Sequence, residues 1–207
     1  MAIRLRGKSK FRQPFDILTA ILFKIIQALT FLFVIAAIFM NPVAKTGIIN
    51  PKADYLITVS WPDNDPNDID TYVEDPAGDI LNFTNKDVGL MHLDRDDRGN
   101  LNDTIVVDGK TIHNPLNQEV TTIRGIVPGE YVVNINYYAT QNNKPVPVSI
   151  SVDKVNPVLE VVYYGTVTLQ KKGDEKTVVR FTINPDGTVS NVNHIPKSLV
   201  DKVFKNG

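Results

Sequence analysis

The chain has 207 residues, of which 43% are hydrophobic and 22% are charged, a composition typical of folded domains. The absence of cysteine excludes disulfides, cysteine nucleophiles and thiolate metal sites. The net charge of -1 is unevenly divided, because residues 1–24 hold six basic residues and one acidic residue whereas the rest holds 16 basic and 22 acidic residues; we therefore expect no nucleic-acid partner, since phosphate binding needs basic surfaces.

The first predicted element is a long apolar helix. Residues 17–40 read ILTAILFKIIQALTFLFVIAAIFM and contain one charge, Lys24. At about 1.5 Å per residue, this segment measures roughly 36 Å as a helix, enough to cross a hydrocarbon core of about 30 Å. It is also longer than the apolar core of a cleaved signal peptide, which is the alternative interpretation. We therefore predict a transmembrane helix over residues 16–41.

The charges on either side of this helix predict its orientation. Five basic residues lie before it, whereas only Lys45 and Lys52 follow soon after it. The positive-inside rule then places a basic tail, residues 1–15, in the cytoplasm. The expected location is the bacterial inner membrane, crossed once, with the carboxy-terminal domain in the periplasm after a linker over residues 42–53.

Polar and small side chains form a stripe along the predicted helix. On a helical wheel Lys24 lies at the edge of this stripe, whose other members are Asp16, Thr19, Ala20, Gln27, Thr30 and Ala37. Polar groups in a bilayer usually face protein or water, so the stripe predicts a membrane-protein partner or a homo-oligomer formed through the helix. In the alternative, Lys24 reaches the inner headgroups from a lone anchor in lipid.

The start of the helix carries a family resemblance. The segment PFDILTA, residues 14–20, resembles the membrane helix of the small subunits of ion-driven rotary motors, namely the flagellar stator B subunit, ExbD and TolR. In that family an aspartate near the cytoplasmic end accepts the translocated ion. The resemblance implies that Asp16 is the ion carrier.

Alternating strands follow over residues 54–195. YLITVSW, YVVNINYY, VSISV and TVVRFTI place apolar residues on one face and, for the most part, polar residues on the other, which is the signature of half-buried strands. DPAG, VPGE and NPDG are turn sequences, and FTINPDGTVSNV predicts a hairpin. The spacing predicts a mainly β fold, an antiparallel β-sandwich of immunoglobulin-like or jelly-roll-like type. Residues 196–207 are expected to form a short helix or tail, with the helix starting at Pro196.

Two segments of this domain carry a second resemblance. DIDTYVEDPAGDI, residues 68–80, and IRGIVPGEYVVNINYY, residues 123–138, are similar to motifs of bacterial extracytoplasmic β-sandwich modules of the YfaP-like and pre-peptidase C-terminal type. The resemblance implies a module that binds or braces. Physically, Pro128 and Gly129 should turn the chain so that Tyr131 enters the core.

Acidic loops offer a candidate calcium site, because calcium binds six to eight oxygen ligands. The candidate ligands are Asp63, Asp65, Asp68 and Asp70 in the first loop and Asp94, Asp96, Asn100, Asn102 and Asp103 in the second. The second loop begins like an EF-hand but has Arg98 and Ile105 where ligands should stand. The alternative is that these side chains cap turns or pair with Arg95 and Arg98.

No catalytic motif is recognisable. The three histidines are scattered, and neither a nucleophile elbow nor a glycine-rich phosphate loop is present. We therefore expect a non-enzymatic protein without a cofactor other than calcium, acting as a binding or scaffold subunit of an envelope complex. Two alternatives remain: a motor small subunit that uses Asp16, and a calcium-dependent adhesion or carbohydrate-binding module.

Overall fold

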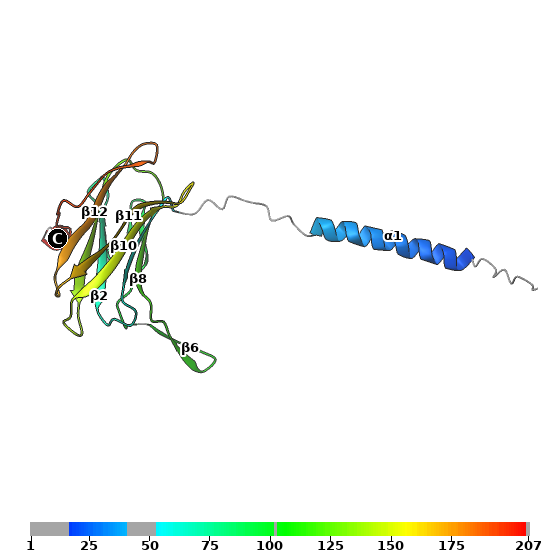
Figure 1. Cartoon of the computed structure of the whole chain (residues 1–207), viewed down its shortest axis with the longest axis horizontal. Coiled ribbons are helices and arrows are strands. Elements are labelled where there is room, and N and C mark those ends of the chain that lie inside the picture. The colour runs from blue at the N-terminus through cyan, green and yellow to red at the C-terminus, as the bar shows by residue number, and fades with distance from the viewer. Residues whose placement is uncertain (1–16, 41–52, 102, 206–207) are drawn as a thin grey trace, which may run out of the picture. The chain divides into compact units, whose positions relative to one another are not determined.

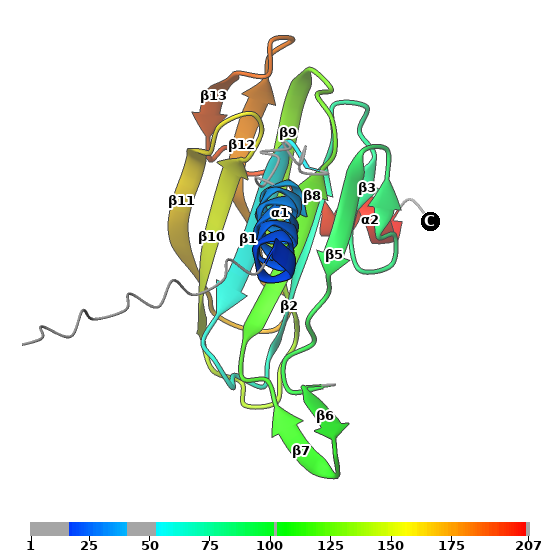
Figure 2. The same ribbon diagram turned by 90° about the vertical axis from the view of Figure 1, so that its right-hand side faces the viewer.

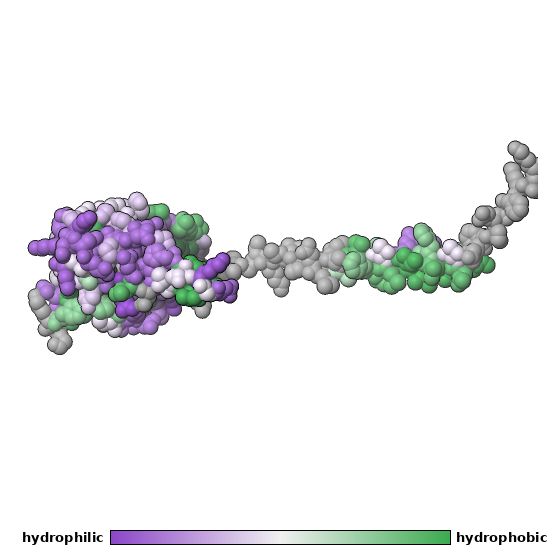
Figure 3. All heavy atoms as spheres, turned by 90° about the horizontal axis from the view of Figure 1, so that it is seen from below, coloured by the Kyte–Doolittle hydropathy of each residue, from purple (hydrophilic) through white to green (hydrophobic). Residues whose placement is uncertain are grey.

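The computed structural model describes residues 17–40, 53–101 and 103–205. The chain divides into two compact units, residues 1–49 and 50–207. The first unit contains helix α1 (Ile17–Met40), in which no residue of the window Ile17–Ala36 is buried. The helix is long and apolar enough to span a membrane, and its surface is predominantly hydrophobic (Figure 3). The predicted apolar helix is confirmed.

The second unit is an antiparallel β-sandwich (Figure 1). Its elements are β1 (Tyr55–Trp61), β2 (Asp68–Glu74), β3 (Ile80–Leu81), β4 (Asp87–Val88), β5 (Met91–Arg95), β6 (Thr104–Val107), β7 (Lys110–His113), β8 (Asn117–Ile123), β9 (Gly129–Ala139), β10 (Val146–Lys154), β11 (Glu160–Leu169), β12 (Glu175–Ile183), β13 (Val189–Asn193) and α2 (Val200–Lys205). One sheet has the order β11-β10-β1-β8-β5-β4 and the other β13-β12-β9-β2-β3. Strands β6 and β7 form a separate hairpin that projects from one end of the sandwich (Figure 2). The predicted mainly β class is confirmed.

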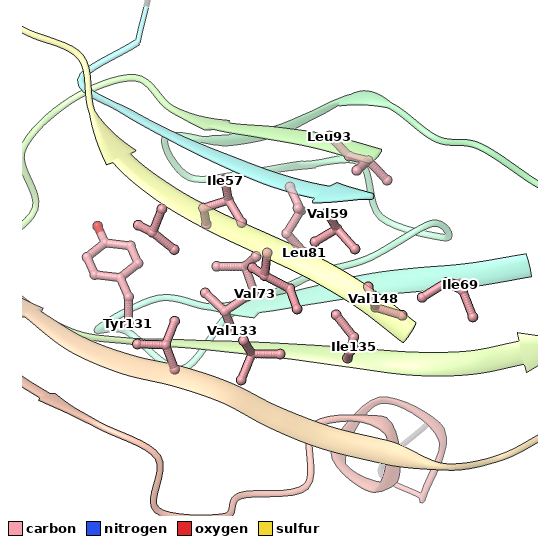
Figure 4. Close-up of a cluster of buried hydrophobic side chains, with 14 of the residues drawn as sticks. Ile57, Val59, Ile69, Val73, Leu81, Leu93, Tyr131, Val133, Ile135 and Val148 are labelled. Carbon is pink, nitrogen blue, oxygen red and sulfur yellow. The ribbon is translucent and has the colours of Figure 1, made fainter. Parts of the chain in front are cut away.

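The core lies between the two sheets and follows the predicted alternation. On β1 every second residue is buried, from Tyr55 to Trp61. The inward residues of β10 lie beside them in the same sheet, and those of β9 face them from the other sheet; Figure 4 shows Ile57, Val133 and Val148 among these core side chains. These β-branched side chains pack well on a pleated surface, and their burial away from water is the main stabilising contribution to the sandwich.

The turn sequences place one aromatic residue in this core as predicted. Gly129 adopts a φ of 138°, a conformation that favours glycine. Tyr131 follows, is 1% exposed, and stacks on Phe181 with ring centroids 5.6 Å apart. The NPDG turn closes with a hydrogen bond from the Gly187 amide to the Asn184 carbonyl, and β12 pairs with β13 in the predicted hairpin.

The outer face of β9 differs from a solvated sheet face. Asn134 and Asn136 point away from the core as predicted, yet both are buried. The Asn134 amide donates hydrogen bonds to the Glu175 carboxylate and to the Lys197 carbonyl. The carboxy-terminal segment therefore covers this face, and it also buries Tyr72 and Glu74 of β2, which contact Leu199 and the lysines Lys197 and Lys202 respectively.

The terminal helix begins at Val200, four residues later than the prediction from Pro196. The reason is a pair of hydrogen bonds that hold Lys197 against β12: its amide donates to Thr177 Oγ1, and its carbonyl accepts from the same hydroxyl. Leu199 is fully buried and packs with Tyr72 and Val132 on the outer face of the sheet.

Candidate metal centre

A glycine brings the two acidic loops into contact. Gly99, in the loop after β5, has a φ of 63° and lies directly against the backbone of Pro66 and Asn67 in the loop before β2. A side chain at this position would meet those backbone atoms. The second acidic loop can therefore approach the first closely only because residue 99 has no Cβ.

The carboxylates of Asp70, Asp96 and Glu119 meet beside this contact. Asp70 belongs to β2 of the five-stranded sheet, Glu119 to β8 of the six-stranded sheet, and Asp96 follows β5 directly. One oxygen from each residue lies within 4.8 Å of the other two. Glu119 Oε2 accepts a hydrogen bond of 2.7 Å from the Thr71 amide, so the cluster bridges the two sheets.

Each of the three carboxylates has a buried oxygen that lacks a hydrogen-bond partner among the described residues. Glu119 is 1% exposed and Asp70 is 2% exposed. Among the residues described, no hydrogen bond reaches Glu119 Oε1, Asp70 Oδ2 or Asp96 Oδ1. Three neighbouring carboxylates, those of Asp68, Asp97 and Asp103, also have one such oxygen each. Buried polar atoms in folded proteins almost always have partners, so this group needs an explanation.

Basic side chains neutralise only part of this charge. Lys86 Nζ lies 2.6 Å from Asp96 Oδ2, and an Arg95 nitrogen lies 2.7 Å from Asp97 Oδ2. In both carboxylates the basic group contacts Oδ2, whereas Oδ1 is the oxygen without a partner. A surface hollow of about 390 Å³ adjoins the cluster and is lined in part by Asp96, Asp97 and Asp103.

The surroundings disfavour negative charge on these residues. Burial, followed by the charges of Asp68 and Asp96, raises the pKa of Asp70 to about 8. Burial and then Asp96 raise the pKa of Asp68 to about 6. Burial, followed by the charge of Asp70, raises the pKa of Glu119 well above its usual range. Burial and mutual repulsion therefore favour the binding of protons or of a cation at the cluster.

The structure assembles some of the predicted calcium ligands and disperses others. Asp68, Asp70 and Asp96 come together, and Asp103 is buried near Asp97. The other predicted residues are Asp63 and Asn100, which are exposed, Asp65, which caps the Asn67 amide, Asp94, which pairs with Arg124, and Asn102, which lies outside the described residues.

Glu119 and Asp97 were missed in the sequence. In NQEVTTI, Glu119 occupies the same face as Thr121 and Ile123, which are both buried, but this polar segment shows its inward face only through its pairing in the sheet. An acidic residue on the inward face of a strand is uncommon without a partner. The only feature of the local sequence that points to Asp97 is its position among other acidic residues.

The polar stripe of the helix is partly paired within α1. Lys24 Nζ donates to Gln27 Oε1 at 3.2 Å, and Thr30 Oγ1 donates to the Ile26 carbonyl at 2.9 Å. Thr19 also belongs to the described helix. Asp16, the candidate ion carrier, lies outside the described residues.

Comparisons of the chain with protein-family models, with curated proteins and with solved structures gave no match. Within the described ranges, the one group of three metal-ligand side chains is the acidic cluster, and it offers only oxygen atoms. Such a set is typical of hard cations such as calcium and magnesium.

Proposed function

We propose that this chain is a membrane-anchored, non-enzymatic β-sandwich protein that serves as a binding or scaffold subunit of a bacterial envelope complex. The observation that supports it most directly is the exposure of α1: none of the 20 residues Ile17–Ala36 is buried. An apolar surface of this length is stable only against lipid or other apolar helices.

The charge distribution supports an orientation with the β-domain outside the cytoplasm. Basic residues are concentrated before α1, and the positive-inside rule keeps such a segment on the cytoplasmic side. The sandwich then lies in the periplasm, tethered by residues 41–52. A domain anchored to the bilayer in this way is suited to contacts with other envelope proteins.

Apolar side chains on the surface of the domain support a role in protein contacts. Strand β11 is an edge of the six-stranded sheet, and exposed apolar residues lie on it and just before it: Val158, Leu159, Val161 and Tyr164, each more than 60% exposed. An edge strand offers unpaired backbone groups to a partner. The hairpin β6–β7 carries a second exposed apolar group, Ile105, Val106, Val107 and Ile112.

The pair Lys24–Gln27 provides the contact within the membrane. A charged group at this depth is costly against lipid and favourable against a polar partner helix. The double variant Lys24→Leu/Gln27→Leu removes the polar group but keeps the helix apolar and of the same length. It should therefore remain in the membrane and lose the partner.

Purification of the full chain in mild detergent tests the proposal. We expect the wild type to elute as a complex with a co-purifying membrane protein, and the Lys24→Leu/Gln27→Leu variant to be recovered from membranes without it. Recovery of the wild type as a lone monomer, at expression close to its natural level, would contradict the proposed role.

A further inference from the structure

We propose that Asp70, Asp96 and Glu119 bind one calcium ion at the junction of the two sheets. This inference goes beyond the proposed function, because it concerns a site inside the β-domain and does not depend on the anchor or its partner. It also changes the ligand set expected from the sequence, since Glu119 of β8 replaces the loop residues Asp63, Asp65 and Asp94.

The spacing of the three oxygens suits a calcium ion. Calcium lies about 2.3–2.6 Å from each oxygen, so two ligands on opposite sides of the ion are about 4.6–5.2 Å apart. The oxygens of Asp70, Asp96 and Glu119 all lie within 4.8 Å of one another. A single ion placed among them is therefore at or close to coordinating distance from all three.

Burial provides an independent argument. Glu119 Oε1 and Asp70 Oδ2 are cut off from solvent, and no hydrogen bond to either exists among the described residues. A buried carboxylate oxygen without a partner is costly. Glu119 cannot easily turn away, because its Oε2 holds the Thr71 amide. Its other oxygen is thus fixed in the position of a ligand.

The local charges favour a divalent ion over the nearby basic side chains. Lys86 reaches Asp96 on the far oxygen, and Arg95 is occupied by Asp97 and by the Leu116 carbonyl. Acidic groups therefore outnumber basic groups around the three unpartnered oxygens. A single ion of charge two would neutralise most of the repulsion among them. The adjoining hollow is polar and is lined by Asp96, Asp97 and Asp103 together with Lys86, Arg95 and Arg98.

The competing explanation is that protons neutralise the cluster. In that case the carboxyl groups of Asp70 and Glu119 would be protonated at neutral pH, and calcium would have no effect on stability. Replacing a carboxylate with the amide of the same shape removes the charge that would bind calcium and leaves the packing unchanged. A lost response to calcium in such a variant is therefore not the result of a folding defect. Glu119→Gln keeps an oxygen for the Thr71 amide and removes a charge, so the metal-free variant should be at least as stable as the metal-free wild type.

Thermal unfolding of the full chain in detergent is the experiment. Trp61 is the single tryptophan, is 4% exposed, and donates its indole hydrogen to the Asn67 carbonyl beside the site, so its fluorescence reports on this region. Chelator-treated protein is heated at neutral pH with and without calcium chloride, at about tenfold the roughly millimolar dissociation constant of extracellular calcium modules. We expect calcium to raise the midpoint by about 3–6 °C.

Three variants and a salt control complete the test. Glu119→Gln and Asp70→Asn should lose the rise while unfolding in chelator at or above the wild-type midpoint. Asp94 lies on the neighbouring strand β5 and pairs with Arg124, so the control variant Asp94→Asn should keep the calcium-dependent rise in the midpoint. Absence of the rise in the wild type, an equal rise in sodium chloride of the same ionic strength, or an undiminished rise in both site variants would overturn the proposal.

Discussion

A Cβ atom on Gly99 would lie 2.7 Å from the carbonyl oxygen of Asn67, closer than such atoms approach in proteins. The obstacle is backbone, which cannot swing aside as a flexible side chain does. The contact holds the loop that carries Asp96 against Pro66 and Asn67, which directly precede Asp68 of β2. The identity of one residue without a side chain thus determines whether the acidic cluster can form.

Gly99→Ala should therefore destabilise the domain. The variant suffers both a left-handed backbone conformation and a collision, and we expect a loss of about 2–4 kcal/mol in the free energy of unfolding, measured by urea titration with Trp61 fluorescence. Gly173→Ala is the matched control, because its φ is 86° but nothing lies within 4 Å of its added Cβ. Equal losses in the two variants would show that the loop contact contributes nothing.

Leu199 should anchor the carboxy-terminal segment. It is fully buried against Tyr72 and Val132, and its amide donates to Glu175 Oε1 at 2.6 Å. Leu199→Ala should cost about 2–4 kcal/mol, the usual range for a buried leucine. Phe204 of the same helix is 54% exposed, so Phe204→Ala should change the free energy of unfolding by less than about 1 kcal/mol. A comparable loss in both would contradict the described packing.

Glu74 should make this docking sensitive to acid. Burial by itself would raise the pKa of Glu74, but hydrogen bonds and charge from Lys197 and Lys202 outweigh it and lower the pKa from its ordinary value of 4.5. The folded state then binds the proton less tightly than the unfolded state. The stabilisation is complete above about pH 4.5 and is lost as the pH falls through the lowered folded-state value.

The variant Glu74→Gln isolates that contribution. At neutral pH it should be less stable than the wild type by about 1–3 kcal/mol, since a charged acceptor for two lysines is lost. The difference should shrink as the pH falls below 4.5, as urea titrations at several pH values would reveal. A difference that stays constant, or that grows in acid, would be inconsistent with this arrangement.

The exposed edge strand should matter for binding and not for folding. Tyr164 on β11 is 72% exposed, so Tyr164→Lys should change the free energy of unfolding by less than about 0.5 kcal/mol. A charge in place of Tyr164 disrupts the exposed apolar group that a partner would bury, and the co-purifying partner should be reduced. Thr168→Lys, on the same strand outside the apolar group, is the control. Retention of the partner in both variants would assign the contact to another surface.

Most of the sandwich could be predicted from the sequence because its inward residues are apolar. Tyr55, Ile57 and Val59 alternate with less buried positions on β1. In the sequence, such alternation indicates a half-buried strand. Strand β8 lacks this signal, since its inward side chains Asn117, Glu119 and Thr121 are polar. Its strand pattern is visible only once the sheet places it beside β1.

The acidic cluster was only half predictable for the same reason. Asp68 and Asp70 stand out locally, but Glu119 is 49 positions after Asp70 in the chain and joins it through the contact of two different sheets. Local density of acids also suggested Asp94, which the structure pairs with Arg124. Which carboxylates face one another depends on tertiary packing, and no local pattern encodes it.

The central claim is that the β-domain lies across the membrane from the amino terminus, and the chain is well suited to a direct test because it has no cysteine. Lys172→Cys, in the exposed turn between β11 and β12, and Ser9→Cys, before the helix, each introduce one thiol into the full chain. In cells with a permeabilised outer membrane, a membrane-impermeant maleimide should label Lys172→Cys at once and Ser9→Cys only after lysis. Labelling of Ser9→Cys with protection of Lys172→Cys in intact cells would contradict the account.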